Sequence, residues 1–171
     1  MLRTPIVCFV ILCGSNAYAS EVSYWFGPVP YGATAEKAKT ILGAKAEESI
    51  SGKHAFVSYM DVVGGLESEV SYRLSDKRSV EAVIVKPKSV EVINMRECWD
   101  RFSNVFGQLK RKYGSPDVEP KPRAIVPSVG LYEERATFTK PSGKITASAT
   151  MAKDKCFLSV SYERTASGSE F

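Results

Sequence analysis

The pattern of apolar and polar residues between Asn94 and Tyr113 is the most regular in the chain. Apolar side chains recur there at the i, i+3, i+4 and i+7 spacing of one buried helical face. Asn94 suits an N-cap, and Gly114 supplies the left-handed residue that often ends a helix. The spacing therefore predicts one long helix, around which the rest of the fold is organised.

A second, shorter helix is predicted near the start of the domain. Thr34 is a favourable N-cap, and Gly43 ends the run of alanine, isoleucine and leucine that makes a narrow apolar face. Residues 44–52 show no such periodicity and are expected to form a loop.

Alternation of apolar and polar residues predicts six β-strands in two groups of three. The pair Gly64-Gly65 indicates a tight hairpin between the first two strands. In the strand at 79–86, Val80, Ala82 and Ile84 are expected on one face. The predicted strands are 54–63, 66–74, 79–86, 131–139, 144–151 and 156–163.

This order of elements predicts an α+β fold. We expect an antiparallel sheet of about six strands, built from two β-β-β meanders, with one long and one short helix packed on one face. Residues 32–87 and 94–163 show the same α-β-β-β pattern without a shared sequence, which suggests duplicated halves of a single domain at 20–164. The small polar residues at 165–171 are expected to be a disordered tail.

Residues 1–19 have the pattern of a secretory signal peptide. A positive charge at Arg3 is followed by a short apolar run, and Ala17-Tyr18-Ala19 fits an A-x-A cleavage site. The run is much shorter than the roughly 20 residues that a membrane span needs. We expect cleavage after Ala19, no transmembrane anchor, and a periplasmic or secreted protein.

The chain has four cysteines, two of them inside the predicted leader. The other two, Cys98 and Cys156, fall on the apolar side of the long helix and of the last strand. Disulfides persist in exported proteins, so we predict that these two cysteines pair. The alternatives are a free reactive thiol or a metal ligand.

The formal net charge is +4, and acidic pairs interrupt the basic clusters along the chain. Nucleic-acid-binding proteins usually show a basic stripe in which one sign dominates. The charge pattern therefore argues against nucleic acid as a partner.

No motif for catalysis, metal or cofactor binding stands out. His54 is the one histidine, and no zinc-protease, nucleophile-elbow or phosphate-binding motif is present. Glu67 and Glu69 share one face of a predicted strand and are the remaining candidates for acid–base chemistry. The simpler interpretation is that they belong to a solvated strand face, balanced by Arg73. We expect no cofactor.

Two other stretches are candidates for binding. The aromatic arm near the start of the mature chain holds Trp25 and Tyr31, which form either an exposed patch or a lid over the core. The proline-rich residues 115–130 form either a functional loop or a crossover between strands. The candidate binding residues are Trp25, Tyr31, Glu67, Glu69 and Arg73.

The segment GATAEKAKTILG at 32–43 resembles the helix that opens BamE/SmpA-like domains and the repeats of β-lactamase-inhibitor-type proteins. That resemblance implies an exported module of helices and antiparallel sheet that binds other proteins. It covers about a dozen residues, transfers no site residue, and the lipid-anchor cysteine of the BamE/SmpA group is missing.

The sequence thus predicts an exported binding or interaction module without catalytic activity. It would act through an exposed sheet face or the aromatic arm, on another envelope or secreted protein. The alternative from another class is a carboxylate-dependent hydrolase that acts on the cell wall. The oligomeric state stays open.

Overall fold

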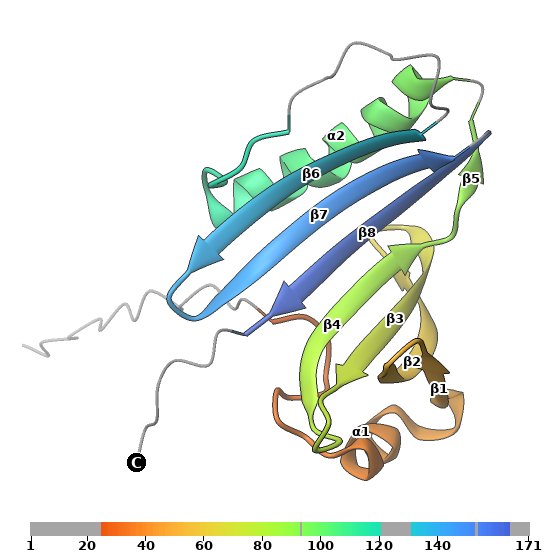
Figure 1. Cartoon of the computed structure of the whole chain (residues 1–171), viewed down its shortest axis with the longest axis vertical. Helices are drawn as coiled ribbons and strands as arrows, with labels where there is room; N and C mark the ends of the chain where they lie inside the picture. Colours follow the sequence, from red (N-terminus) through yellow and green to blue (C-terminus); the bar gives the residue numbers. More distant parts are fainter. Residues whose placement is uncertain (1–24, 93, 121–130, 153, 165–171) are drawn as a thin grey trace, which may run out of the picture.

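The structure, a computed structural model, describes residues 25–92, 94–120, 131–152 and 154–164. These residues form two α-helices, one 3-10 turn and one antiparallel sheet of eight strands (Figure 1). The predicted α+β class is confirmed. The elements in chain order are α1 (Ala35–Leu42), η1 (Gly43–Lys45), β1 (Glu47–Ser51), β2 (His54–Val63), β3 (Leu66–Leu74), β4 (Val80–Pro87), β5 (Val90–Glu91), α2 (Met95–Tyr113), β6 (Leu131–Lys140), β7 (Gly143–Ala152) and β8 (Lys155–Glu163).

The strand order is β1-β2-β3-β4-β8-β7-β6, and β5 pairs with the start of β8. We call α1 with β1–β4 the amino half, and α2 with β6–β8 the carboxyl half. The halves meet where β4 pairs with β8, from Ala82–Glu163 to Val85–Val160. The last of the described strands, β8, therefore lies inside the sheet (Figure 1).

The sequence predicts about six strands, whereas the described residues contain eight. One of the two additional strands, β1, lies in the stretch predicted to be a loop. All five of its residues are exposed, so no alternation of buried positions marks it in the sequence. It forms because its backbone pairs with β2, from Glu47–Ser58 to Ser51–His54. The other, β5, is only two residues long.

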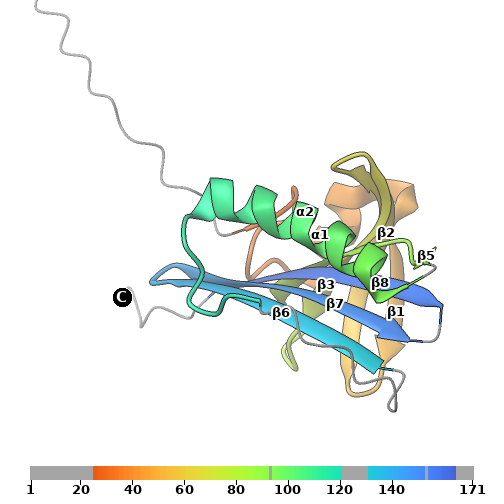
Figure 2. The same cartoon turned by 90° about the horizontal axis from the view of Figure 1, so that it is seen from above.

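Both helices lie on the same side of the sheet (Figure 2). We call this side the core face. The α2 helix covers β6 and β7, and α1 packs against β2. Burial of this face supplies most of the apolar contact that holds the fold together. Its central row, aligned by the strand register, consists of Val70, Val85, Val160, Ala147 and Ala136.

The long helix has the face that its sequence predicts. Cys98, Phe102 and Leu109 are buried, and Phe102 stacks on Phe106 with ring centroids 6.3 Å apart. The Asn94 Oδ1 atom accepts a hydrogen bond of 3.0 Å from the backbone N–H of Glu97, which satisfies one free donor of the first turn.

The prediction that Val80, Ala82 and Ile84 share one face of β4 is wrong for Val80. Val83 and Val85 lie on the core face, whereas Ala82 and Ile84 point to the opposite side. A bulge in the β3–β4 pairing shifts the register by one residue, so Val80 also reaches the core. The alternation of apolar and polar residues along the sequence does not reveal such an inserted residue.

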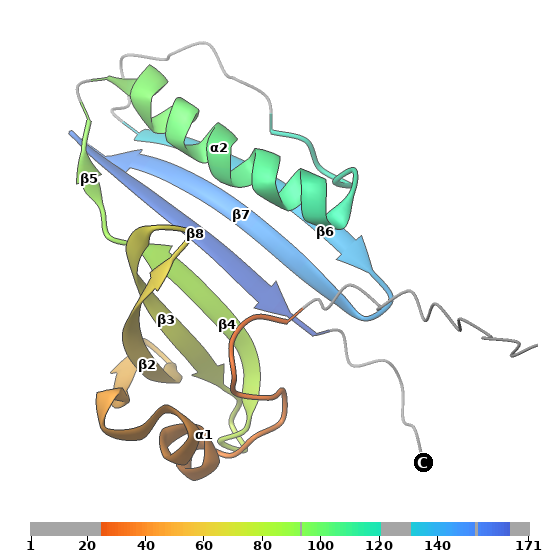
Figure 3. The same cartoon turned by 180° about the vertical axis from the view of Figure 1, so that it is seen from behind.

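An irregular segment, residues 25–33, covers the core face beside the β4–β8 junction (Figure 3). Phe26 stacks on Tyr162, with centroids 5.6 Å apart. Gly27 has a φ of 84°, and a Cβ atom added there would lie 2.1 Å from the Tyr72 hydroxyl oxygen. Only glycine therefore fits at this position without a shift.

The predicted leader at 1–19, the tail at 165–171 and residues 121–130 lie outside the described residues. The first part of the proline-rich stretch is described, and it runs along the outer edge of β6, where Val118 forms an isolated bridge with Thr137. Within the described ranges, no helix is long and apolar enough to cross a membrane.

Candidate interaction surface

The side of the sheet opposite the helices, which we call the outer face, is predominantly polar. Figure 1 is viewed from this side, with α2 behind β6 and β7. Ser58 donates a hydrogen bond of 2.9 Å to Ser71, and Ser148 and Ser159 are bonded at 2.8 Å. One row that crosses the outer face in strand register consists of Ser58, Ser71, Ile84, Ser161, Thr146 and Thr137.

Three of the predicted binding residues, Glu67, Glu69 and Arg73, lie on the outer face. The Arg73 guanidinium donates to Glu81 at 2.7 Å and lies 3.7 Å from Glu163. Glu67 is 3.5 Å from the Lys88 ammonium group, and Glu69 accepts a hydrogen bond of 2.9 Å from Ser71. Arg73 and Glu67 are therefore paired with opposite charges, whereas Glu69 is held by a hydroxyl group.

Apolar side chains interrupt this polar surface at one end. Met60, Val62 and Phe157 are 58%, 64% and 45% exposed, and all three point to the outer face. These three residues are not among the binding residues that the sequence predicts. The available signal was the segment HAFVSYMDVV, which has apolar residues on both sides of its alternation.

The structure places the aromatic candidates over the opposite side of the sheet. Trp25 Nε1 donates a hydrogen bond of 2.6 Å to the Val29 carbonyl, and the Trp25 ring meets Tyr31 edge-on at 5.9 Å. Tyr31 is 38% exposed, and the Arg164 guanidinium lies 5.6 Å above its ring. Because residues 25–33 lie over the core face, the five predicted binding residues do not form one surface.

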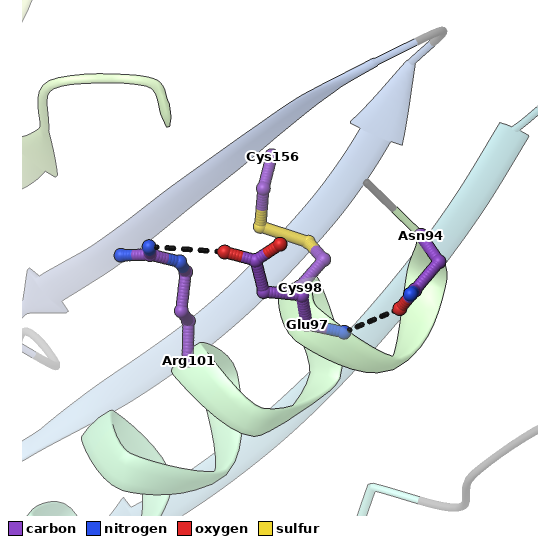
Figure 4. The surroundings of a disulfide bond; sticks show 5 residues. All are labelled: Asn94, Glu97, Cys98, Arg101 and Cys156. Atoms are coloured by element: carbon purple, nitrogen blue, oxygen red, sulfur yellow. Dashed lines mark hydrogen bonds and ion pairs between the residues drawn. A yellow bond between two sulfur atoms is a disulfide. The ribbon is translucent and has the colours of Figure 1, made fainter. Parts of the chain in front are cut away.

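Cys98 and Cys156 form a disulfide between the first turn of α2 and β8 (Figure 4). Their Cα atoms are 5.4 Å apart, and both side chains are buried. Beside this bond, Arg101 Nη2 donates to Glu97 Oε1 at 3.2 Å. A buried disulfide is a structural cross-link, and its sulfur atoms are sheltered from exchange with solvent thiols.

Two buried tyrosines belong to the core. Burial raises the pKa of Tyr72, and the neighbouring Tyr59 raises it further. Burial also raises the pKa of Tyr162, with a smaller contribution from Tyr113. Both hydroxyl groups therefore stay protonated at neutral pH and contribute no charge to the outer face.

The arrangement offers little for metal or acid–base chemistry. Among the described residues, no group of three or more His, Cys, Asp or Glu side chains could hold a metal ion. Glu69 lines a hollow beside Met60, whereas Glu67 lines a separate hollow beside Lys88. His54 meets the Phe56 ring at 6.4 Å at the start of β2. The hydrolase hypothesis remains a prediction, and its two carboxylates open onto different hollows.

Comparison of the chain with known protein families, characterised proteins and solved structures finds no match. The resemblance of residues 32–43 to BamE/SmpA-like and β-lactamase-inhibitor-type modules therefore remains a prediction.

Proposed function

We propose that this chain is an exported interaction module that binds another protein of the envelope or secreted space through its outer face. The observation that carries this proposal is the exposure of Met60, Val62 and Phe157 on a sheet face that already carries paired charges and hydroxyl groups. Exposed apolar side chains on an otherwise polar surface are typical of protein-binding sites.

The difference between the two faces of the sheet supports a binding role. The core face packs against α1, α2 and residues 25–33. No helix among the described residues packs on the outer face (Figure 1 and Figure 2), and serine and threonine side chains line it in rows. A rigid sheet of this kind holds side chains in fixed positions, which lowers the entropy lost on binding.

Export is supported by the cross-link. The Cys98–Cys156 disulfide is buried and joins two elements that are 58 residues apart in the chain. Such bonds persist in oxidising compartments and are rare in reducing ones. The predicted signal peptide is consistent with this location.

The proposal can be tested by site-specific photo-cross-linking in a periplasmic extract. A cross-linking amino acid at Ser159, on the outer face, should capture one reproducible protein. The same group at Gln108, exposed on α2, should not capture it. The captured protein is then purified and its affinity measured for Met60→Lys/Phe157→Lys, which should bind at least about tenfold more weakly.

The matched control is Ile41→Lys/Val118→Lys, which changes two exposed apolar residues that lie off the outer face. It should bind like the unchanged protein. Equal binding by both double variants, or no capture from Ser159 by folded protein, would contradict the proposal.

A further inference from the structure

The two edges of the sheet are finished differently. At the β6 edge, Asp117 N–H donates to the Thr137 carbonyl at 2.8 Å, and Val118 bridges the same residue. At the other edge, β1 pairs with β2 only as far as Ser58, so Tyr59 to Val63 extend beyond it. Within the described residues, no strand pairs with this part of β2 on its outer side.

Hairpin geometry shows which backbone groups point to that open edge. The two-residue turn at Gly64-Gly65 makes Val63 and Leu66 a hydrogen-bonded pair, so every second residue of β2 bonds to β3. The residues between them, including Met60 and Val62, direct their N–H and C=O groups outward. In agreement, the Val62 N–H donates to its neighbour Asp61 Oδ1 at 2.8 Å rather than to β3.

A hollow of about 340 Å³ lies beside this edge, on the side of the outer face. Its lining residues are Lys45, Glu47, Ser58, Tyr59, Met60 and Glu69. Glu67 lies close by on the same face of the β2–β3 pairing, and Lys88 partly balances it. This corner of the outer face thus combines three carboxylates, Glu47, Glu67 and Glu69, with two lysines and two exposed apolar side chains.

These charges decide between two kinds of occupant. A second copy of the chain, paired edge to edge, would bring the acidic corner against itself, which is unfavourable. A basic strand would instead place a lysine or arginine beside Met60. The aliphatic stem of that residue would pack on Met60, and its charged end would reach Glu47 and Glu69.

We propose that the open edge of β2 at Met60 and Val62 binds an extended, basic segment of a partner protein by strand addition. Lysine or arginine would alternate along this segment with aliphatic residues. The inference rests on the proposed function, because it names where and how one segment of the partner docks.

The test uses a dye-labelled, capped peptide, Val-Lys-Val-Lys-Val-Lys-Val, and the mature protein. Fluorescence anisotropy should show that the peptide binds. Its affinity should fall by about tenfold or more when the salt concentration is raised from low to physiological or higher, because the charges are exposed. Hydrogen exchange should slow at the amides of Met60 and Val62. A matched peptide with glutamate in place of lysine should not bind.

Val62→Pro removes an outward N–H without removing a β2–β3 hydrogen bond, so β2 should tolerate it at this edge. It should weaken peptide binding by about tenfold. A peptide with N-methyl groups on alternate residues makes the same test without changing the protein. For the charges, Glu47→Gln/Glu69→Gln should weaken binding, whereas Glu91→Gln/Glu133→Gln, at exposed sites elsewhere, should not.

The outcomes separate this inference from the proposed function. If the peptide fails to bind, or binds Val62→Pro and the N-methyl form equally well, strand addition is wrong. Capture of a partner from Ser159 could still succeed in that case. If no partner is captured although the peptide binds as described, the edge site stands and the outer-face proposal fails.

Discussion

The two halves of the sheet are covered by different kinds of structure. In the carboxyl half the cover is α2, a helix of 19 residues with an N-cap and a disulfide to β8. In the amino half the cover is α1, of eight residues, and the irregular segment 25–33. Regular cover is stabilised by a repeated pattern, whereas irregular cover depends on single close contacts, such as that of Gly27 with Tyr72.

This contrast suggests that each half has its own weak point. The covalent bond should matter most for α2, and the glycine contact should matter most for the cover of β3 and β4. The changes below, taken from the largest expected effect to the smallest, test that division.

The largest effect is expected from Cys98→Ala/Cys156→Ala. The cross-link joins residues 58 apart, and the chain-entropy argument gives a loss of about 4 kcal/mol in the free energy of unfolding. Urea unfolding measures that loss, and hydrogen exchange should show α2 opening more readily than β2 and β3. If hydrogen exchange became faster by the same factor in both halves, the disulfide would not stabilise α2 in particular.

The amino half should respond to Gly27→Ala. The new methyl group would meet the Tyr72 hydroxyl, and φ is positive, so we expect a loss of about 2–3 kcal/mol. Gly52→Ala is the matched control, because its φ is 61° and no atom lies within 4 Å of the added carbon. That control should lose only about 1–2 kcal/mol.

Tyr72→Phe in the Gly27→Ala background distinguishes the clash from backbone strain. Removal of the hydroxyl oxygen should recover part of the lost stability, on the order of 1 kcal/mol, in the same urea experiment. If the double variant shows simple additivity, the contact between residue 27 and Tyr72 is not the cause.

The N-caps give a smaller effect that should be similar in both halves. Asn94 and Thr34 each accept a hydrogen bond from the third residue after them, at 3.0 Å and 3.2 Å. Asn94→Ala and Thr34→Ala should each cost about 1 kcal/mol in urea unfolding. A much larger loss for Thr34→Ala would show that α1, although short, holds more of the amino half than its length suggests.

The smallest effect is expected from Glu48, which joins β1 to Lys39 of α1 and to Arg78. Hydrogen bonds from these two groups hold the pKa of Glu48 below its ordinary value of 4.5. A carboxyl group with a lowered folded pKa stabilises the protein above its unfolded pKa, and this contribution disappears as pH falls through the folded value. Glu48→Gln should therefore flatten the fall in Tm below about pH 4.5. An unchanged pH profile would show that the exposed pairs contribute nothing.

The features that the sequence predicted correctly are those with local signals. The α2 helix follows from its 3.6-residue period and from Asn94, and the β2–β3 hairpin follows from Gly64-Gly65. The pairing of the cysteines was also predicted, because Cys98 lies on the apolar side of its helix and Cys156 on the apolar side of its strand. Each of these inferences needs only neighbours along the chain.

The features that were missed depend on distant partners. β1 has no apolar pattern and forms only because β2 offers its edge. The bulge that places Val80 on the core face, opposite to Ala82, arises in the pairing of two strands. In the same way, nothing along the chain shows that Trp25 and Glu67 lie on opposite sides of the sheet, or that Met60 and Val62 lie at an open edge.

The central place of β8 has a consequence for how the protein is made. This strand leaves the ribosome after all the other described strands, yet it joins β4 to β7, so the continuous sheet cannot close until Glu163 has emerged. Contacts between such distant segments form slowly. Cys156 belongs to the same strand, so oxidation of the cysteine pair also has to wait. For a polypeptide that crosses a membrane before it folds, this late closure would keep the chain unfolded during passage. The sheet and the disulfide would then form after the chain has crossed.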